Sequence, residues 1–140
     1  MLQIQNCESA ESTACELFEQ AIQLQHEGNL DGAVSLLHQA IEIYPCDHRF
    51  FVELSNVLCQ LGMSSRAEKF ARTATVLGPA DWCSWFALSG TLIEQGLMVE
   101  AQQSAIKANS VCPAGLRSIF TQNRLTFLSN FINSHEEVAA

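Results

Sequence analysis

The feature that most constrains the fold of this chain is an internal repeat with a period of about 34 residues. Four positions of the unit carry the same residue type three times: Gly28, Gly62 and Gly96; Ala33, Ala67 and Ala101; Ala40, Ala74 and Ala108; and Pro45, Pro79 and Pro113. A unit of this length holds two helices and cannot bury its apolar face alone, so neighbouring units stack. The sequence therefore predicts an all-α chain of three stacked units, at about residues 14–47, 48–81 and 82–115.

Each repeated residue type has a physical role in such a unit. The glycines follow a helix-length segment, where a residue with positive φ ends a helix well. The alanines lie in the second helix, where a methyl group lets two backbones approach. The prolines end that helix, because proline donates no hydrogen bond and restricts the residue before it. The expected unit is thus helix–turn–helix, with glycine in the turn.

This pattern resembles the tetratricopeptide repeat. The residues that match the first-helix pattern of that family are Trp85, Leu88, Ser89 and Leu92 in the third unit, and Phe51, Leu54, Ser55 and Leu58 in the second. The first unit matches more loosely, with Leu17, Gln20, Ala21 and Leu24, as befits an outer repeat. The resemblance covers about residues 14 to 115 and implies an α-solenoid of three repeats.

The segments outside the repeats differ in character. Residues 1–11 are polar, and we expect them to form an N-terminal tail. After Pro113, apolar residues at helical spacing predict a helix over 116–134 that caps the last unit, followed by a tail over 135–140. Leu125 and Ile132 make this helix apolar on more than one side, so homodimer formation through it stays open as an alternative.

The concave face of the stack is the candidate binding site, because the first helices of stacked units line it. We expect ten residues to form the site: Phe18, Ile22, His26, Arg49, Val52, Asn56, Cys59, Cys83, Phe86 and Ile93. Cys15, Gln25, Gln60, Gly90 and Glu94 share that face. Within the stretch 49–52, Phe51 matches a core position, Arg49 and Val52 match the concave face, and the repeat assigns no role to Phe50. Large apolar residues beyond the needs of the core indicate a binding surface, although the chain's own termini are an alternative occupant.

Charge and hydropathy exclude several classes of function. The net charge is −8. The first 48 residues include eight Asp or Glu residues and no Lys or Arg. Such a surface repels nucleic acids and anionic membranes. No apolar run approaches the roughly 18 residues that span a membrane, and residues 1–12 do not resemble a signal peptide. We expect a cytoplasmic protein that binds no nucleic acid and does not insert into a membrane.

No pattern indicates an enzyme. The sequence has no phosphate-binding loop, no G-x-G-x-x-G and no H-E-x-x-H, and its four histidines are scattered. The cluster Cys46, Asp47 and His48 has metal-ligand residue types, but three adjacent residues in a turn point in different directions. We expect no catalysis, no metal and no cofactor; a reactive thiol at Cys59 or Cys83 is a third, weaker alternative.

One stretch carries a closer resemblance. Residues 47–62, "DHRFFVELSNVLCQLG", resemble the second repeat of the type III secretion chaperones that hold hydrophobic translocator proteins in the bacterial cytoplasm. The resemblance implies a chaperone whose concave face holds an apolar segment of a secreted partner. The third unit lacks the His and Ala-Glu-Cys pattern of that family, and residues 1–11 are too short for its dimerisation region. The alternative function is a scaffold or assembly adaptor that acts through its convex face or C-terminal helix.

A different class of tetratricopeptide protein is excluded by its residues. Co-chaperones that grip the acidic C-termini of heat-shock proteins use a clamp of Lys, Asn and Arg side chains. The matching positions here hold Phe18, Ile22, Glu53, Cys83 and Ala87. None of these is a cation, and Glu53 would repel the ligand.

Overall fold

The computed structural model describes the backbone of residues 2–117 and 119–139, with side chains described over 8–115 and 119–136. The described residues form helices and turns without a strand. The helices are α1 (Leu2–His26), α2 (Leu30–Ile43), α3 (His48–Gln60), α4 (Ser64–Leu77), α5 (Trp82–Glu94), α6 (Met98–Val111), α7 (Ala114–Arg117) and α8 (Phe120–Ala139).

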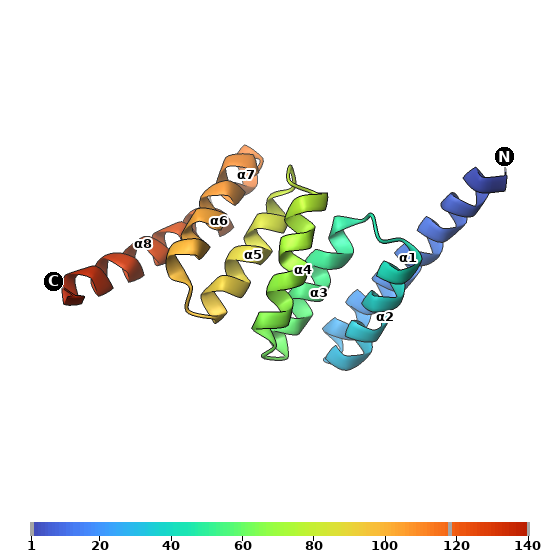
Figure 1. Ribbon diagram of the computed structural model, residues 1–140, viewed down its shortest axis with the longest axis horizontal. Helices are drawn as coiled ribbons and strands as arrows, with labels where there is room; N and C mark the ends of the chain where they lie inside the picture. The colour runs from blue at the N-terminus through green and yellow to red at the C-terminus, as the bar shows by residue number, and fades with distance from the viewer. Residues whose placement is uncertain (1, 118, 140) are drawn as a thin grey trace.

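The helices form three pairs that stack in a row (Figure 1). α1 packs on α2, α3 on α4, and α5 on α6, while α2 contacts α3 and α4 contacts α5 to join one pair to the next. α8 packs on α6 and closes the stack at its C-terminal end. The predicted fold, an all-α solenoid of three helix pairs with a terminal helix, is confirmed.

The turns within the pairs show why glycine recurs. Gly28, Gly62 and Gly96 have φ of 85°, 78° and 79°, in the left-handed region that side chains with a Cβ avoid. A second repeated device begins α3 and α5. Asp47 and Asp81, one repeat period apart, are N-caps whose carboxylates accept the backbone N–H of Arg49 and Cys83. The period therefore fixes both where helices end and where they begin.

The core lies between the helices of each pair and between neighbouring pairs. The repeated alanines are fully buried, as are Ala71 and Ala105 on α4 and α6. Phe51, expected in the core, is only 8% exposed. Phe50, to which the repeat assigned no role, is fully buried, and its ring lies 5.2 Å from that of Phe18. Phe50 therefore joins the second helix pair to α1.

The chain ends differ from the predictions. The structure places residues 2–11 in α1 instead of a tail, and α8 continues to Ala139 instead of ending at residue 134. Neither α1 nor α8 contains Gly or Pro, so neither helix is interrupted. The expected helix over 116–134 is divided between α7 and α8, on either side of residue 118, which lies outside the described residues.

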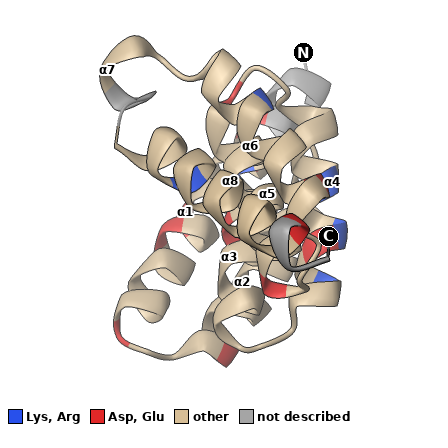
Figure 2. Ribbon diagram, turned by 90° about the vertical axis from the view of Figure 1, so that its left-hand side faces the viewer, with Lys and Arg blue, Asp and Glu red and all other residues tan. Residues whose placement is uncertain are grey.

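Charge is unevenly distributed along the stack. α1 and α2 carry Asp and Glu but no Lys or Arg, whereas α3, α4, α6 and α8 each carry both signs (Figure 2). Among the described residues, no helix combines the length and the apolar character needed to cross a membrane.

Candidate functional site

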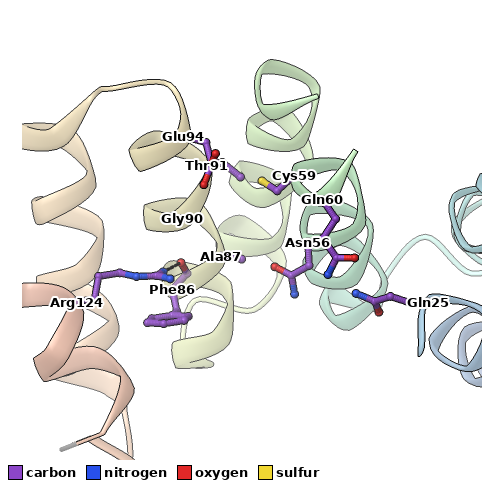
Figure 3. Close-up of a pocket in the computed structure, with 10 residues that line it drawn as sticks. All are labelled: Gln25, Asn56, Cys59, Gln60, Phe86, Ala87, Gly90, Thr91, Glu94 and Arg124. Carbon is purple, nitrogen blue, oxygen red and sulfur yellow. Dashed lines mark hydrogen bonds between the residues drawn. The ribbon is translucent and has the colours of Figure 1, made fainter. Parts of the chain in front are cut away.

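A pocket of about 330 Å³ opens where the first helices of the three pairs face α8 (Figure 3). Its lining comes from α1, α3, α5 and α8 and consists of Gln25, Asn56, Cys59, Gln60, Phe86, Ala87, Gly90, Thr91, Glu94 and Arg124. An adjoining pocket of about 440 Å³ shares Phe86 and Arg124 and adds Ile93, Ile119, Phe120, Asn123 and Phe127. We call these two pockets together the groove.

The repeat explains which side chains reach the groove. Asn56 and Gln60 lie one helical turn apart and therefore on one face of α3. Gly90 and Glu94 occupy the same places on α5, one repeat period later. Because Gly90 has no side chain, α5 contributes only backbone to the pocket lining at this position, opposite the amide side chains of α3.

The groove holds four of the ten predicted site residues. Asn56, Cys59 and Phe86 line the first pocket, and Phe86 and Ile93 line the second. The other six line neither pocket: Phe18, Ile22, His26, Arg49, Val52 and Cys83. That these ten residues bind a partner stays a prediction.

Arg49 is held by its own chain. Its Nη2 lies 2.6 Å from Asp47 Oδ2, and its guanidinium carbon lies 5.6 Å from the ring centroid of Phe18. The hydrogen bond with Asp47 raises the pKa of Arg49 above its usual value. Because Arg49 already has a carboxylate partner, its guanidinium is not free to bind an anionic group of a ligand.

Burial shapes the ionisable groups near the concave face. It raises the pKa of the half-buried Glu53 carboxyl, although a hydrogen bond from Gln25 and the nearby His26 oppose this. Burial raises the pKa of Cys59, as does the charge of Glu94. Burial, followed by the charge of Asp81, raises the pKa of Cys83 to about 11. Both thiols therefore stay protonated at neutral pH, which makes them poor nucleophiles.

The sequence prediction missed Arg124 on α8. Its Nη1 donates to the carbonyl oxygen of Phe86 at 2.6 Å and to Ser89 Oγ at 2.8 Å, and its guanidinium carbon lies 3.4 Å above the Phe86 ring. Burial lowers the pKa of Arg124 to about 10. No signal in the repeat period points to Arg124, because α8 lies outside the repeats.

Metal ions in proteins are held by grouped His, Cys, Asp and Glu side chains. Within the described part of the chain, no three His, Cys, Asp or Glu side chains are grouped so that they could hold a metal ion. Cys46 is exposed and His48 instead contacts Asp81, with Nε2 at 2.8 Å from Oδ2.

Comparisons with known proteins place the fold. No protein-family model matches the chain, and a search of curated proteins finds no match. Among solved structures, the chain resembles the Sgt2 tetratricopeptide-repeat domain from Aspergillus fumigatus, with a TM-score of 0.86 and 18% identity over 91% of this chain and 83% of that one. It also resembles the first such domain of Spaghetti (RPAP3) bound to the HSP90 peptide SRMEEVD, with a TM-score of 0.82 and 15% identity over 88% and 95% of the two chains.

A third solved structure bears on the resemblance found in the sequence. The type III secretion chaperone SycD of Yersinia enterocolitica, in complex with a peptide of the translocator YopD, aligns with a TM-score of 0.77 and 17% identity over 84% of this chain and 93% of that one. The chain therefore has the tetratricopeptide-repeat fold, with three helix pairs closed by a terminal helix, and in this fold it resembles the type III secretion chaperones.

Proposed function

We propose that this chain is a protein-binding module that holds a hydrophobic or amphipathic segment of a partner in its groove, as a cytoplasmic chaperone of a secreted protein. The observation that carries the proposal is the groove itself, whose first pocket is lined by the amide side chains of Gln25, Asn56 and Gln60 and whose second pocket is lined by Phe86, Phe120 and Phe127. Solved structures with this fold support it, since that of SycD holds a peptide of a translocator and that of RPAP3 holds an HSP90 peptide.

The groove suits an extended amphipathic segment on energetic grounds. Phe120 and Phe127 are 51% and 50% exposed, and covering such apolar area stabilises a complex by about 25 cal/mol per Å². Gln25, Asn56 and Gln60 supply donors and acceptors for the backbone of an extended segment. The residues at the clamp positions of heat-shock co-chaperones are not cations, so the proposed partner differs from the acidic C-termini that those proteins hold.

No catalytic role enters the proposal. The thiols of Cys59, which lines the groove, and of Cys83 have raised pKa values, and His48, which does not line the groove, is paired with Asp81. Nucleic acid is not a proposed ligand, because the α1–α2 end of the stack carries only negative charge.

Site-specific photo-crosslinking tests the proposal. A photoreactive residue at Asn56 in the groove should capture a partner from the native cell, whereas the same residue at Val76, which is 77% exposed on α4, should not. Phe86→Asp, at the residue that lines both pockets of the groove, should abolish capture while helicity measured by circular dichroism is retained. Because Phe86 also contacts Trp82, Gln60→Trp, which fills the first pocket from an exposed position and leaves the photoreactive residue at position 56 in place, provides a second blocking variant. Capture of the same partner by all variants would refute the proposal.

A specific observation also favours the alternative function of a scaffold acting through its C-terminal helix. Ile119, Phe120 and Phe127 are each at least half exposed at the C-terminal end of the stack. Light scattering on the full chain and on Phe127→Glu separates the two functions. A dimer that the substitution converts to a monomer supports assembly through α8, and a monomer in both cases supports the groove.

A further inference from the structure

The groove ends at α8 in a cation, Arg124, that makes no ion pair with a described acidic side chain. Within the described side chains, the ion pairs involve His48, Arg49 and Arg72, and none of them involves Arg124. Arg124 nevertheless lines both pockets of the groove. This distinguishes it from Arg49 and Arg72, each of which lies within 2.8 Å of a carboxylate oxygen.

Only part of the guanidinium group of Arg124 is engaged. A guanidinium has five N–H donors, and two of the hydrogen bonds of Arg124 to described residues come from Nη1. Nε and Nη2 make no hydrogen bond with a described residue. Because residue 90 is glycine, no Cβ occupies the position 3.5 Å from Nη1 and 3.8 Å from Nη2, where a Cβ would be in van der Waals contact with the guanidinium. Donors are therefore left for a ligand on the groove side.

The surroundings of Arg124 would strengthen its interaction with a bound anion. Burial is the cause that lowers its pKa to about 10, and no charged side chain among the described residues offsets the loss of water. The Phe86 ring compensates part of this cost, because its negative face lies against the cation. A carboxylate that reached Nε or Nη2 would form charge-assisted hydrogen bonds in a site already shielded from solvent.

The opposite end of the groove carries the opposite charge. Glu94 lies two helical turns after Phe86 on the same face of α5, about 12 Å further along the helix axis. Figure 3 shows Glu94 at one end of this face and Arg124 with Phe86 at the other. The charge of Glu94 repels an anion, so a segment with one carboxylate is favoured only with that group towards α8.

The neighbours of Arg124 define what must stand next to the carboxylate. Phe86, Ile93, Phe120 and Phe127 surround it in the second pocket. The rings of Phe86 and Phe120 lie 6.5 Å apart, and that of Phe120 stacks on Trp82 at 6.2 Å. A ligand that places a carboxylate on Arg124 therefore also presents its adjacent atoms to an apolar, aromatic wall.

We propose that Arg124 anchors a carboxylate of the bound segment, so that the groove selects segments in which a carboxylate stands beside a large apolar side chain and is directed towards α8. This inference rests on the proposed function and specifies the chemistry of its ligand. An Asp or Glu side chain and a C-terminal main-chain carboxylate supply the same group.

Nuclear magnetic resonance with small probes tests the anchor directly. The full chain, labelled with ¹⁵N, is titrated with 3-phenylpropanoate and separately with 3-phenylpropanamide, which differ only in the charged group. The carboxylate should bind about tenfold more tightly than the amide and shift the Nε–H signal of Arg124 and the backbone signal of Gly90. Equal affinity of the two probes in the unsubstituted chain would overturn the inference.

Three variants assign the effect to Arg124. Arg124→Gln should abolish the preference for the carboxylate, and Arg124→Lys should retain most of it, because it keeps the charge. Arg72→Gln is the matched control, since Arg72 pairs with Glu68 and Glu100 outside the groove. If Arg124→Gln keeps the full preference while folded by circular dichroism, another group binds the carboxylate and the inference is wrong.

Short peptides identify the source of the carboxylate. Acetylated Phe-Ala-Glu-Phe amide is compared with its Gln counterpart, and the Gln peptide with the same peptide carrying a free C-terminus. Tighter binding of the Glu peptide indicates a side-chain carboxylate, and tighter binding of the free C-terminus indicates a main-chain one. If all peptides bind equally, the groove binds apolar segments without the anchor, so the proposed function survives and the inference fails. If the carboxylates bind but photo-crosslinking captures no partner, the inference survives and the proposed function fails.

Discussion

His48 and Asp81 join the second helix pair to the third. Nε2 of His48, at the start of α3, lies 2.8 Å from Oδ2 of Asp81, at the start of α5. Asp81 also accepts the backbone N–H of Cys83 at 3.0 Å, so one carboxylate caps a helix and contacts the neighbouring repeat. Asp81 stands one repeat period after Asp47, which caps α3 in the same way. The contact with His48 is therefore an additional role of a capping position that recurs with the repeat.

Substitutions at Asp81 should separate its two roles. Asp81→Asn keeps an acceptor for the helix cap but loses the charge, so we expect a loss of about 1 kcal/mol or less for this partly exposed pair. Asp81→Ala should lose about 1 kcal/mol more, because the cap is also removed. Urea unfolding followed by circular dichroism measures both. Equal stabilities of the two variants would contradict the capping role.

The stability contribution of Asp81 should depend on pH in a defined direction. Burial raises the pKa of Asp81, but the hydrogen bonds from His48 and Cys83 outweigh it and leave the pKa below its usual value. A lowered pKa means that the unfolded chain binds the proton more readily. The advantage of the unsubstituted chain over Asp81→Asn should therefore be complete above about pH 4 and shrink as the pH falls further. An advantage that grew on acidification would contradict this assignment.

Gly78 should be coupled energetically to His48. A Cβ built on Gly78 would overlap the imidazole of His48, so Gly78→Ala should displace that ring from Asp81. We expect a loss of about 1–3 kcal/mol in the unsubstituted chain. In the His48→Ala background the same substitution should cost much less, because the obstruction is gone. A double-mutant cycle by urea unfolding measures the coupling, and additive losses would show that the two residues are independent.

The repeat period predicted the helix pairs because its residues act locally. Gly28, Gly62 and Gly96 set positive-φ turns wherever they stand, and the repeated alanines must be small at each helix crossing. Phe50 shows where this reasoning stops. It packs on Phe18 of the neighbouring pair, while its counterpart one period later is Ser84, so repetition could not assign it to the core.

The groove was harder to predict, because its lining also depends on contacts that the repeat period does not specify. Asn56 and Phe86 were placed by their register on the first helices, and they do line it. Arg49 has the same kind of position, but Asp47, two residues before it, pairs with its charge. Arg124 stands outside the repeats, and its position depends on how α8 lies across α5 and α6, which no local pattern specifies.

The cysteines near the groove should react slowly. The pKa of Cys83 is raised to about 11, first by burial and then by Asp81, and that of Cys59 is raised by burial and Glu94. Because the thiolate is the reactive form, both should be alkylated by iodoacetamide at pH 7 far more slowly than the exposed Cys46. Peptide mass spectrometry over a time course measures the order. Rapid alkylation of Cys59 or Cys83 would revive the hypothesis of a catalytic thiol.

Two adjacent residues of α8 test whether this helix caps the stack. Leu128 is fully buried among Ala101, Ala105 and Leu92, whereas its neighbour Phe127 is 50% exposed. Leu128→Ala should cost about 2–5 kcal/mol through lost contacts and a cavity.

Phe127→Ala is the matched control on the same helix, and it should cost about 1 kcal/mol or less because its ring is half in solvent already. Urea unfolding of the three chains at one concentration measures the difference. If α8 caps the stack, Leu128→Ala should cause the larger loss of stability, because Leu128 covers the end of the α5–α6 core and Phe127 does not. If Phe127→Ala were the more destabilising, and more so at high protein concentration, α8 would instead be stabilised by a second copy of the chain, because the unsubstituted chain then gains stability from an association that the variant has lost.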